Sequence, residues 1–201
     1  MGIPVLILGE SGSGKSTSLR NFKEDEVAVF NVAGKPLPFR KKLETYKTRN
    51  YSKIMSGIEK LGKKVYIVDD SQYLMAFSMF DRAKETGYGK FTDIAVDFKN
   101  LITFVIEKTP DDCIVYFLHH IERDDTGRIK AKTSGKMLDQ QLTLEGLFSI
   151  VLMAQANDGG YEFITQSDGY TTCKSPMEMF ELAIDNDLKM VDTTIREYWD
   201  L

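Results

Sequence analysis

The residues best suited to chemistry stand near the start of the sequence, where glycines, hydroxyls and one lysine follow an apolar run. Ile3 to Leu8 has the composition of a buried strand, and Gly9-Glu10-Ser11-Gly12-Ser13-Gly14-Lys15-Ser16-Thr17 follows it directly. This stretch matches GxxxxGK[ST], the Walker A pattern, in the strand-to-helix context that the pattern requires. The sequence therefore predicts a phosphate-binding loop, the alternative being a glycine-rich turn that holds no ligand.

Each residue type in this loop has a physical reason. Gly9, Gly12 and Gly14 can adopt positive φ angles, so successive backbone N–H groups can turn inward around an anion. The N-terminus of the helix expected from about Gly14 would add positive potential. Lys15 supplies a mobile ammonium for the β- and γ-phosphates. We therefore expect a nucleoside triphosphate, ATP, as the ligand, held by residues 9–17, with Lys15 also acting in catalysis.

A predicted metal site joins this loop to a second strand. Val65 to Val68 is apolar and ends in Asp69 and Asp70, and ligands of open α/β sheets bind at the C-terminal ends of such strands. Ser16 and Asp69, the latter as a Walker B aspartate, are expected to hold Mg²⁺. Thr17 could reach the α-phosphate. Asp70 is expected either to polarise the attacking water or to cap the next helix, and the sequence leaves both roles open.

The two histidines of the chain, His119 and His120, end another predicted strand, Cys113 to Leu118. A neutral imidazole at that position could contact the γ-phosphate or hold the attacking water. Neighbouring strand residues point to opposite faces, so at most one histidine reaches the nucleotide. We expect that residue to be His119, with a buried and fully hydrogen-bonded histidine as the alternative.

A basic stretch follows a β-hairpin predicted over residues 121–130. Arg128, Lys130, Lys132 and Lys136 fall within nine residues that contain no acid, although the net charge of the chain is −4. This local charge could contact the backbone of single-stranded DNA or the nucleotide of a neighbouring subunit. An ordinary exposed hairpin is the alternative.

Strands and helices alternate along the chain and must position these residues. Apolar runs predict strands over residues 3–8, 27–32, 65–68, 113–118 and 147–153, and helical spacing predicts helices over 52–61, 73–83 and 92–108. Residues 33–38 are expected to form a loop, and the basic stretch 40–49 a solvated surface, with a phosphate-binding face as the alternative. A hairpin is expected between 161–165 and 170–174, followed by helical segments over 176–186 and 191–198. The pattern predicts an α/β fold whose mainly parallel sheet is flanked by helices and carries a C-terminal antiparallel hairpin.

Composition narrows the class of protein. With 201 residues and 42% hydrophobic residues, the chain can form one domain with a sizeable core, and we expect it to span residues 1–201. No apolar run reaches the roughly 18 residues of a membrane span, and no signal peptide is evident at the start, so we expect a cytoplasmic protein without membrane contact. Cys113 and Cys173 are expected to be packing residues.

The sequence resembles the RecA-like P-loop ATPases encoded by bacteriophages, in particular the short group proposed to act in single-strand annealing or recombination. The resemblance covers nearly the whole chain. It rests on Gly9 to Thr17, Lys35-Pro36-Leu37-Pro38, Val65 to Asp70, His119-His120, and Thr133-Ser134-Gly135-Lys136 leading to Leu144-Glu145-Gly146. It implies a sheet of order 5-1-4-3-2, numbering the five predicted parallel strands along the chain. It also implies Mg²⁺-dependent ATP hydrolysis, self-association into a homo-oligomer, and contact with single-stranded DNA.

One departure from this family keeps other functions open. RecA has a catalytic glutamate at the end of its second strand, whereas this chain reads Asn31-Val32-Ala33 there. A nucleotide-dependent assembly factor with little hydrolysis is therefore one alternative. A small-molecule or nucleotide kinase is another, although the arginines form no compact pair of the kind that lids of such enzymes carry.

Overall fold

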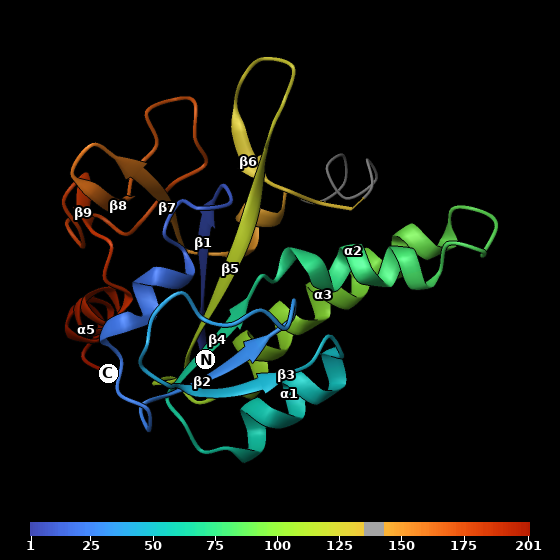
Figure 1. The fold of residues 1–201 in the computed structure, drawn as a ribbon, viewed down its shortest axis with the longest axis horizontal. Helices are drawn as coiled ribbons and strands as arrows, with labels where there is room; N and C mark the ends of the chain where they lie inside the picture. Colours follow the sequence, from blue (N-terminus) through green and yellow to red (C-terminus); the bar gives the residue numbers. More distant parts are fainter. Residues whose placement is uncertain (135–142) are drawn as a thin grey trace.

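A central, mostly parallel β-sheet flanked by helices organises the structure, which is a computed structural model that describes residues 1–134 and 143–201 (Figure 1). Within these residues the strands are β1 (Ile3–Gly9), β2 (Val27–Asn31), β3 (Glu44–Lys47), β4 (Val65–Asp69), β5 (Ile114–Arg123), β6 (Ile129–Ala131), β7 (Ile150–Asn157), β8 (Gly160–Ile164) and β9 (Ala183–Asp185). The helices are α1 (Tyr51–Lys60), α2 (Gln72–Asp81), α3 (Gly89–Lys108) and α5 (Leu188–Trp199), with short 3₁₀ helices η1 (Ser16–Asn21) and η2 (Leu144–Leu147). The predicted α/β class is confirmed.

The strands follow the order β3-β2-β4-β5-β1-β7-β8-β9, and β6 pairs with β5 beside this path. Pairing is parallel from β3 through to β7, and antiparallel between β7, β8 and β9 and between β5 and β6. Because β1, β4 and β5 run side by side in the same direction, their C-terminal ends meet at one edge of the sheet. The phosphate-binding pattern, the paired aspartates and the histidines all lie at this edge.

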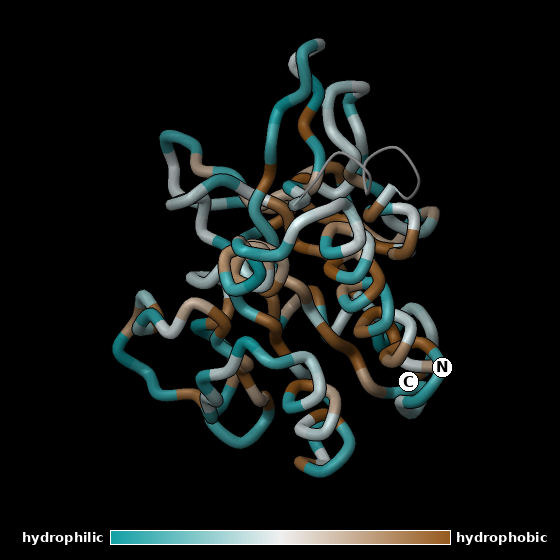
Figure 2. Tube along the Cα trace, turned by 90° about the vertical axis from the view of Figure 1, so that its right-hand side faces the viewer, coloured by the Kyte–Doolittle hydropathy of each residue, from teal (hydrophilic) through white to brown (hydrophobic). Residues whose placement is uncertain are grey.

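Both faces of the sheet are buried, which explains why its strands are apolar throughout rather than alternating. Leu6 and Leu8 of β1 point to the face covered by α1, α2 and α3, whereas Val5 and Ile7 point to the face covered by η1 and α5. Figure 2 shows the hydrophobic segments mainly in the interior and the hydrophilic ones along the outer loops. Burial on both faces makes the sheet a rigid support for the residues at its edge.

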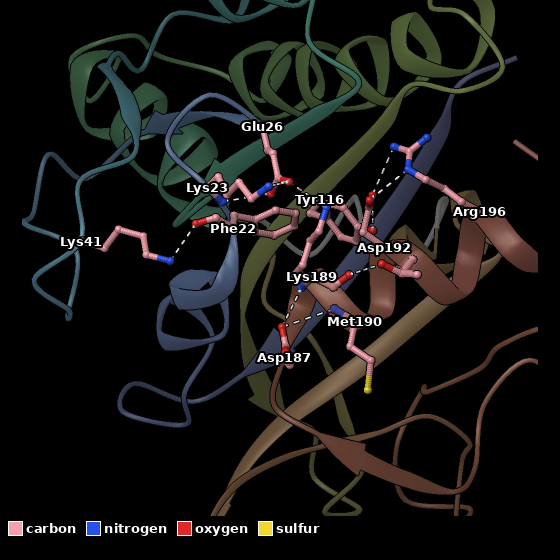
Figure 3. A network of polar contacts seen from close by, with 11 residues as sticks. Phe22, Lys23, Glu26, Lys41, Tyr116, Asp187, Lys189, Met190, Asp192 and Arg196 are labelled. Atoms are coloured by element: carbon pink, nitrogen blue, oxygen red, sulfur yellow. Dashed lines mark hydrogen bonds and ion pairs between the residues drawn. The ribbon is translucent and has the colours of Figure 1, made fainter.

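Helix α5 is fixed to the sheet by polar contacts as well as by its apolar face (Figure 3). Asp187 caps the helix, accepting hydrogen bonds from the backbone N–H groups of Lys189 (3.0 Å) and Met190 (3.3 Å). The buried Asp192 accepts hydrogen bonds from the Tyr116 hydroxyl of β5 (3.2 Å) and from Arg196 Nε (2.9 Å). These contacts tie α5 to β5, the strand whose far end carries both histidines.

The α-helix expected after the phosphate-binding pattern is instead the six-residue 3₁₀ helix η1. The chain continues beyond it with Glu24, Asp25 and Glu26, and carboxylates at a helix C-terminus oppose the helix dipole. So short a helix contributes little dipole, and an anion at its start would depend on backbone N–H groups and lysines.

Residues 40–49, expected to be solvated surface, contain the edge strand β3, which pairs with β2. Its exposed Tyr46 and Lys47 gave the stretch a polar appearance, although Leu43 just before it is buried. Short, polar edge strands of this kind lack the apolar run by which buried strands are recognised.

The C-terminal hairpin exists, but the expected pairing of 161–165 with 170–174 is wrong. Strand β8 pairs antiparallel with β7 through a turn at Asp158 and Gly159, and only an isolated bridge joins Lys174 to Val151. The helix expected over 176–186 is also wrong, because Ala183–Asp185 forms β9 against β8. Pairing at the free edge of β8 overrides the local helical pattern.

None of the helices in residues 1–134 and 143–201 is long and apolar enough to cross a lipid bilayer.

Candidate phosphate-binding site

A cleft of about 290 Å³ lies at the C-terminal edge of the parallel strands. The loop after β1 forms one wall, and the turn after β2 forms the other. Asp69 and Asp70 at the end of β4, His120 of β5 and Tyr161 of β8 complete the lining. Residues from five separate strands or strand ends therefore meet in one cleft.

The loop after β1 depends on its glycines. Gly12 and Gly14 have φ angles of 82° and 93°, a region that disfavours side chains. A Cβ on Gly9 would lie 2.3 Å from the Ser13 hydroxyl, and one on Gly14 would lie 2.8 Å from the Tyr161 ring. The loop therefore forms a glycine cradle: Gly12 and Gly14 have the expected positive φ, whereas Gly9 lies outside that region and is required because a Cβ has no room there.

Lys15 lies across this cradle. Its ammonium donates hydrogen bonds to the carbonyl oxygens of Gly9 (2.8 Å) and Glu10 (2.7 Å), and the residue is only 6% exposed. Burial lowers its pKa to about 8, although Asp70 and Asp69 nearby oppose the shift. Lys15 therefore remains mostly protonated at neutral pH, as binding of a polyphosphate requires.

Ser16 and Asp69, the two residues expected to hold Mg²⁺, lie in direct contact. The Ser16 hydroxyl donates to Asp69 Oδ1 at 2.8 Å, which joins the phosphate-binding loop to β4. Burial raises the pKa of Asp69, and the hydrogen bond from Ser16 opposes this rise. No group of three His, Cys, Asp or Glu side chains converges in the described part of the chain. One hydroxyl and one carboxylate suit Mg²⁺, which commonly takes its other ligands from phosphate and water.

Both carboxylate oxygens of Asp70 accept hydrogen bonds. It has an unusual left-handed φ of 58°, its Oδ1 accepts from His120 Nε2 at 3.1 Å, and its Oδ2 accepts from Lys35 Nζ at 2.8 Å. Burial raises its pKa, but the hydrogen bonds from His120 and Lys35 outweigh this and lower it to about 2. Such a carboxylate is a weak base. Asp70 does not cap α2 through its side chain either, so its geometry suits positioning of Lys35 and His120.

The two histidines have different environments. His119 is fully buried, accepts at Nδ1 from the Ser71 hydroxyl (2.9 Å) and donates from Nε2 to the Lys132 carbonyl (2.8 Å). Burial lowers its pKa to about 4, partly opposed by the bond to Lys132. His119 does not line the cleft, whereas His120 does. The structure thus places at the cleft the histidine that the sequence did not favour.

Arg128 and Lys130 belong to the β5–β6 hairpin (Figure 1), Lys132 directly follows β6, and none of the three lines the cleft. Arg128 and Lys132 are exposed, and Lys130 pairs with Glu122 at 3.1 Å. Lys136 lies outside the described residues. The carbonyl of Lys132 accepts the hydrogen bond from His119 Nε2.

Two polar residues that line the cleft, Lys35 and Tyr161, were not predicted as site residues. Lys35 was noted only as part of the family resemblance, and Tyr161 only as part of a hairpin. Neither stands in a pattern that specifies a ligand, because their places depend on how the turn after β2 and the β7–β8 hairpin fold over the loop.

A comparison of the sequence with known protein families finds no match, and neither does a comparison with curated proteins. The class of site therefore rests on the geometry of this chain: a glycine cradle, a buried lysine and a serine–aspartate pair at the end of a mostly parallel sheet.

Proposed function

We propose that the chain is a Mg²⁺-dependent ATP-binding protein and ATPase of RecA-like type. The observation that carries this proposal is the 2.8 Å contact of Ser16 with Asp69 beside Lys15, next to a loop whose Gly9 and Gly14 leave no room for a Cβ. A hydroxyl, a carboxylate and an ammonium at this spacing are suited to a metal-bound triphosphate.

The strand order supports the RecA-like assignment. The five strands that the sequence predicted as parallel, now β1, β2, β4, β5 and β7, lie in the order β7-β1-β5-β4-β2. Strand β5 lies between β1 and the aspartate strand β4, β2 lies beyond β4 on the same side, and β7 lies beside β1 on the other side. Strands β3, β8 and β9 extend the sheet at its edges.

This proposal gives the residues of the cleft different roles. Lys15 and the backbone N–H groups of residues 9–17 bind the phosphates, while Ser16 and Asp69 hold the metal. Mg²⁺, when bound, neutralises charge that develops on the phosphates. His120, oriented by Asp70, is the histidine available to the terminal phosphate or to water.

A nucleotide-dependent assembly factor with little hydrolysis is the second candidate function. It is favoured by Asp70, whose two oxygens both have partners, and by Asn31 at the end of β2, whose amide is bonded to its own turn. Neither residue is placed as a strong general base, so turnover is expected to be slow.

Single-stranded DNA and other copies of the chain are the proposed partners, in phage recombination or annealing. The exposed Arg128 and Lys132 on a projecting hairpin support this part of the proposal, because such residues can contact a phosphate backbone in a protein of net charge −4.

Binding of a fluorescent ATP analogue with Mg²⁺ tests the proposal. Lys15→Ala should weaken binding by about 100-fold or more, because it removes a buried charge-assisted contact. Lys41→Ala is the matched control, since Lys41 bonds to the Phe22 carbonyl and does not line the cleft. Equal affinity of Lys15→Ala and the control would refute the site. Phosphate release with and without single-stranded DNA then separates an ATPase from an assembly factor.

A further inference from the structure

The cleft contains a second ammonium, supplied by the turn after β2. Lys35 lies on the wall opposite the phosphate-binding loop, and its Nζ donates to Asp70 Oδ2 at 2.8 Å. The same Nζ lies 5.3 Å from the centre of the Tyr73 ring. Lys35 and Lys15 both lie near Asp69 and Asp70, so two cations face the same part of the cleft.

The turn that carries Lys35 is held by a buried residue. Asn31, 2% exposed at the end of β2, accepts from the Gly34 backbone N–H at 2.7 Å and donates to the Lys35 carbonyl. Gly34 has a φ of 71°, which lets the chain reverse at that point. Asn31, which stands where RecA has its catalytic glutamate, therefore holds the turn that places the Lys35 ammonium at the cleft.

An ordinary ion pair does not account for this arrangement. An exposed pair contributes little to stability and needs no support from a buried residue. The Lys35 side chain keeps 62% of its surface exposed while its ammonium is already aimed along the cleft by Asp70. An ammonium has three N–H donors, and the bond to Asp70 uses one.

We propose that Lys35 binds the terminal phosphate of the bound triphosphate, with Asn31 and Asp70 as positioning residues. This inference rests on the proposed function. Lys35 lies on the side of the cleft that carries Asp69 and Asp70, and a metal held by Ser16 and Asp69 would there neutralise charge on the outer phosphates. A second cation on that side is placed to stabilise the γ-phosphate and the charge that it gains during transfer.

Affinities for fluorescent ATP and ADP analogues, measured in Mg²⁺ with the full chain, test the inference. In Lys35→Ala, ATP affinity should fall about 10- to 100-fold, the loss of one charge-assisted hydrogen bond, while ADP affinity changes less than threefold. Lys35→Arg should restore most of the preference for ATP. Lys41→Ala, a lysine from the same connection between β2 and β3 that lies outside the cleft, should match the wild type.

The outcomes separate this inference from the proposed function. If the wild type binds ATP and Lys35→Ala leaves the ratio of ATP to ADP affinity unchanged, the inference is overturned and the proposed function stands. If the wild type binds neither nucleotide, both are overturned. Thermal unfolding of each variant confirms that it is folded, which is expected because Lys35 is largely exposed.

Discussion

At the scale of single residues, partners and burial decide what each titratable side chain can do. Asp70 and His119 were both predicted to act in catalysis, yet each has its polar atoms engaged by neighbours. Asp70 is held ionised, whereas His119 is held neutral. The residues in a position to act on a ligand are Lys35 and His120, which Asp70 orients.

His119 should make the protein less stable as the pH falls. Its folded pKa of about 4 lies below the ordinary value of 6.5, so between these values the unfolded chain binds the extra proton. The stability that His119 contributes is complete above pH 6.5 and is lost as the pH falls toward 4. From pH 7 to pH 5 the loss is about 2 kcal/mol.

Urea unfolding of the wild type and of His119→Gln at both pH values measures this effect. Glutamine can accept and donate as the neutral imidazole does but does not titrate. The drop in unfolding free energy between pH 7 and pH 5 should be about 2 kcal/mol smaller in the variant. Equal drops in the two proteins would show that His119 is not the group responsible.

At the scale of elements, the alternation of side chains along strands explains which predictions succeeded. Ile114, Tyr116 and Leu118 of β5 pack on the face covered by η1, and His120 continues their series. His119 continues the opposite series, which packs against α3. Alternation alone predicted that at most one histidine would face the nucleotide. Choosing between them required knowing on which face η1 lies, and that is a tertiary property.

The same reasoning accounts for the elements themselves. Strands β1, β2, β4, β5 and β7 and helices α1, α2 and α3 were predicted because burial imposes an apolar run or a 3.6-residue period on their sequences. Strands β3 and β9 are short and sit toward the edges of the sheet, where exposed residues dilute that pattern. The turn that presents Lys35 has no periodicity, so its role became visible only through the contacts of Asn31.

Gly14→Ala should impair the cradle more than it impairs the fold. A φ of 93° costs an alanine about 1–2 kcal/mol, and its Cβ would lie 2.8 Å from the Tyr161 ring. We expect ATP affinity to fall at least about tenfold, because the loop and Tyr161 must move apart.

Gly62→Ala is the matched control for Gly14→Ala. Gly62 follows α1 with a φ of 65° and has nothing within 4 Å of the added Cβ. Its replacement should cause a similar loss of stability, of about 1–2 kcal/mol, without changing ATP affinity. A parallel loss of affinity in both variants would mean that general destabilisation, and not the cradle, is being measured.

At the scale of the whole molecule, two groups of basic residues occupy different parts of the structure. Lys15 and Lys35 lie in the cleft beside two aspartates, whereas Arg128 and Lys132 project on the β5–β6 hairpin. One strand, β5, connects them, because His120 faces the cleft and His119 bonds to the backbone beside the hairpin. A ligand in the cleft would contact His120, and a polyanion on the hairpin would contact Arg128 and Lys132. The two ligands would therefore bind within the single segment of residues 120–132.

Binding of single-stranded DNA should depend steeply on salt, and the hairpin should carry part of that dependence. Each phosphate contact on a single strand contributes about 0.7 to the slope of log affinity against log salt. Arg128→Ala combined with Lys132→Ala should therefore reduce the size of this slope by about 1.4 in fluorescence anisotropy titrations with an oligonucleotide.

The matched control is Lys53→Ala with Lys60→Ala, which removes two exposed charges from α1, far from β6 in Figure 1. Because both double variants change the net charge of −4 by the same amount, general electrostatics would affect them alike. A lower slope in the hairpin variant alone locates the DNA contact, whereas equal slopes in all three proteins would remove the hairpin from it.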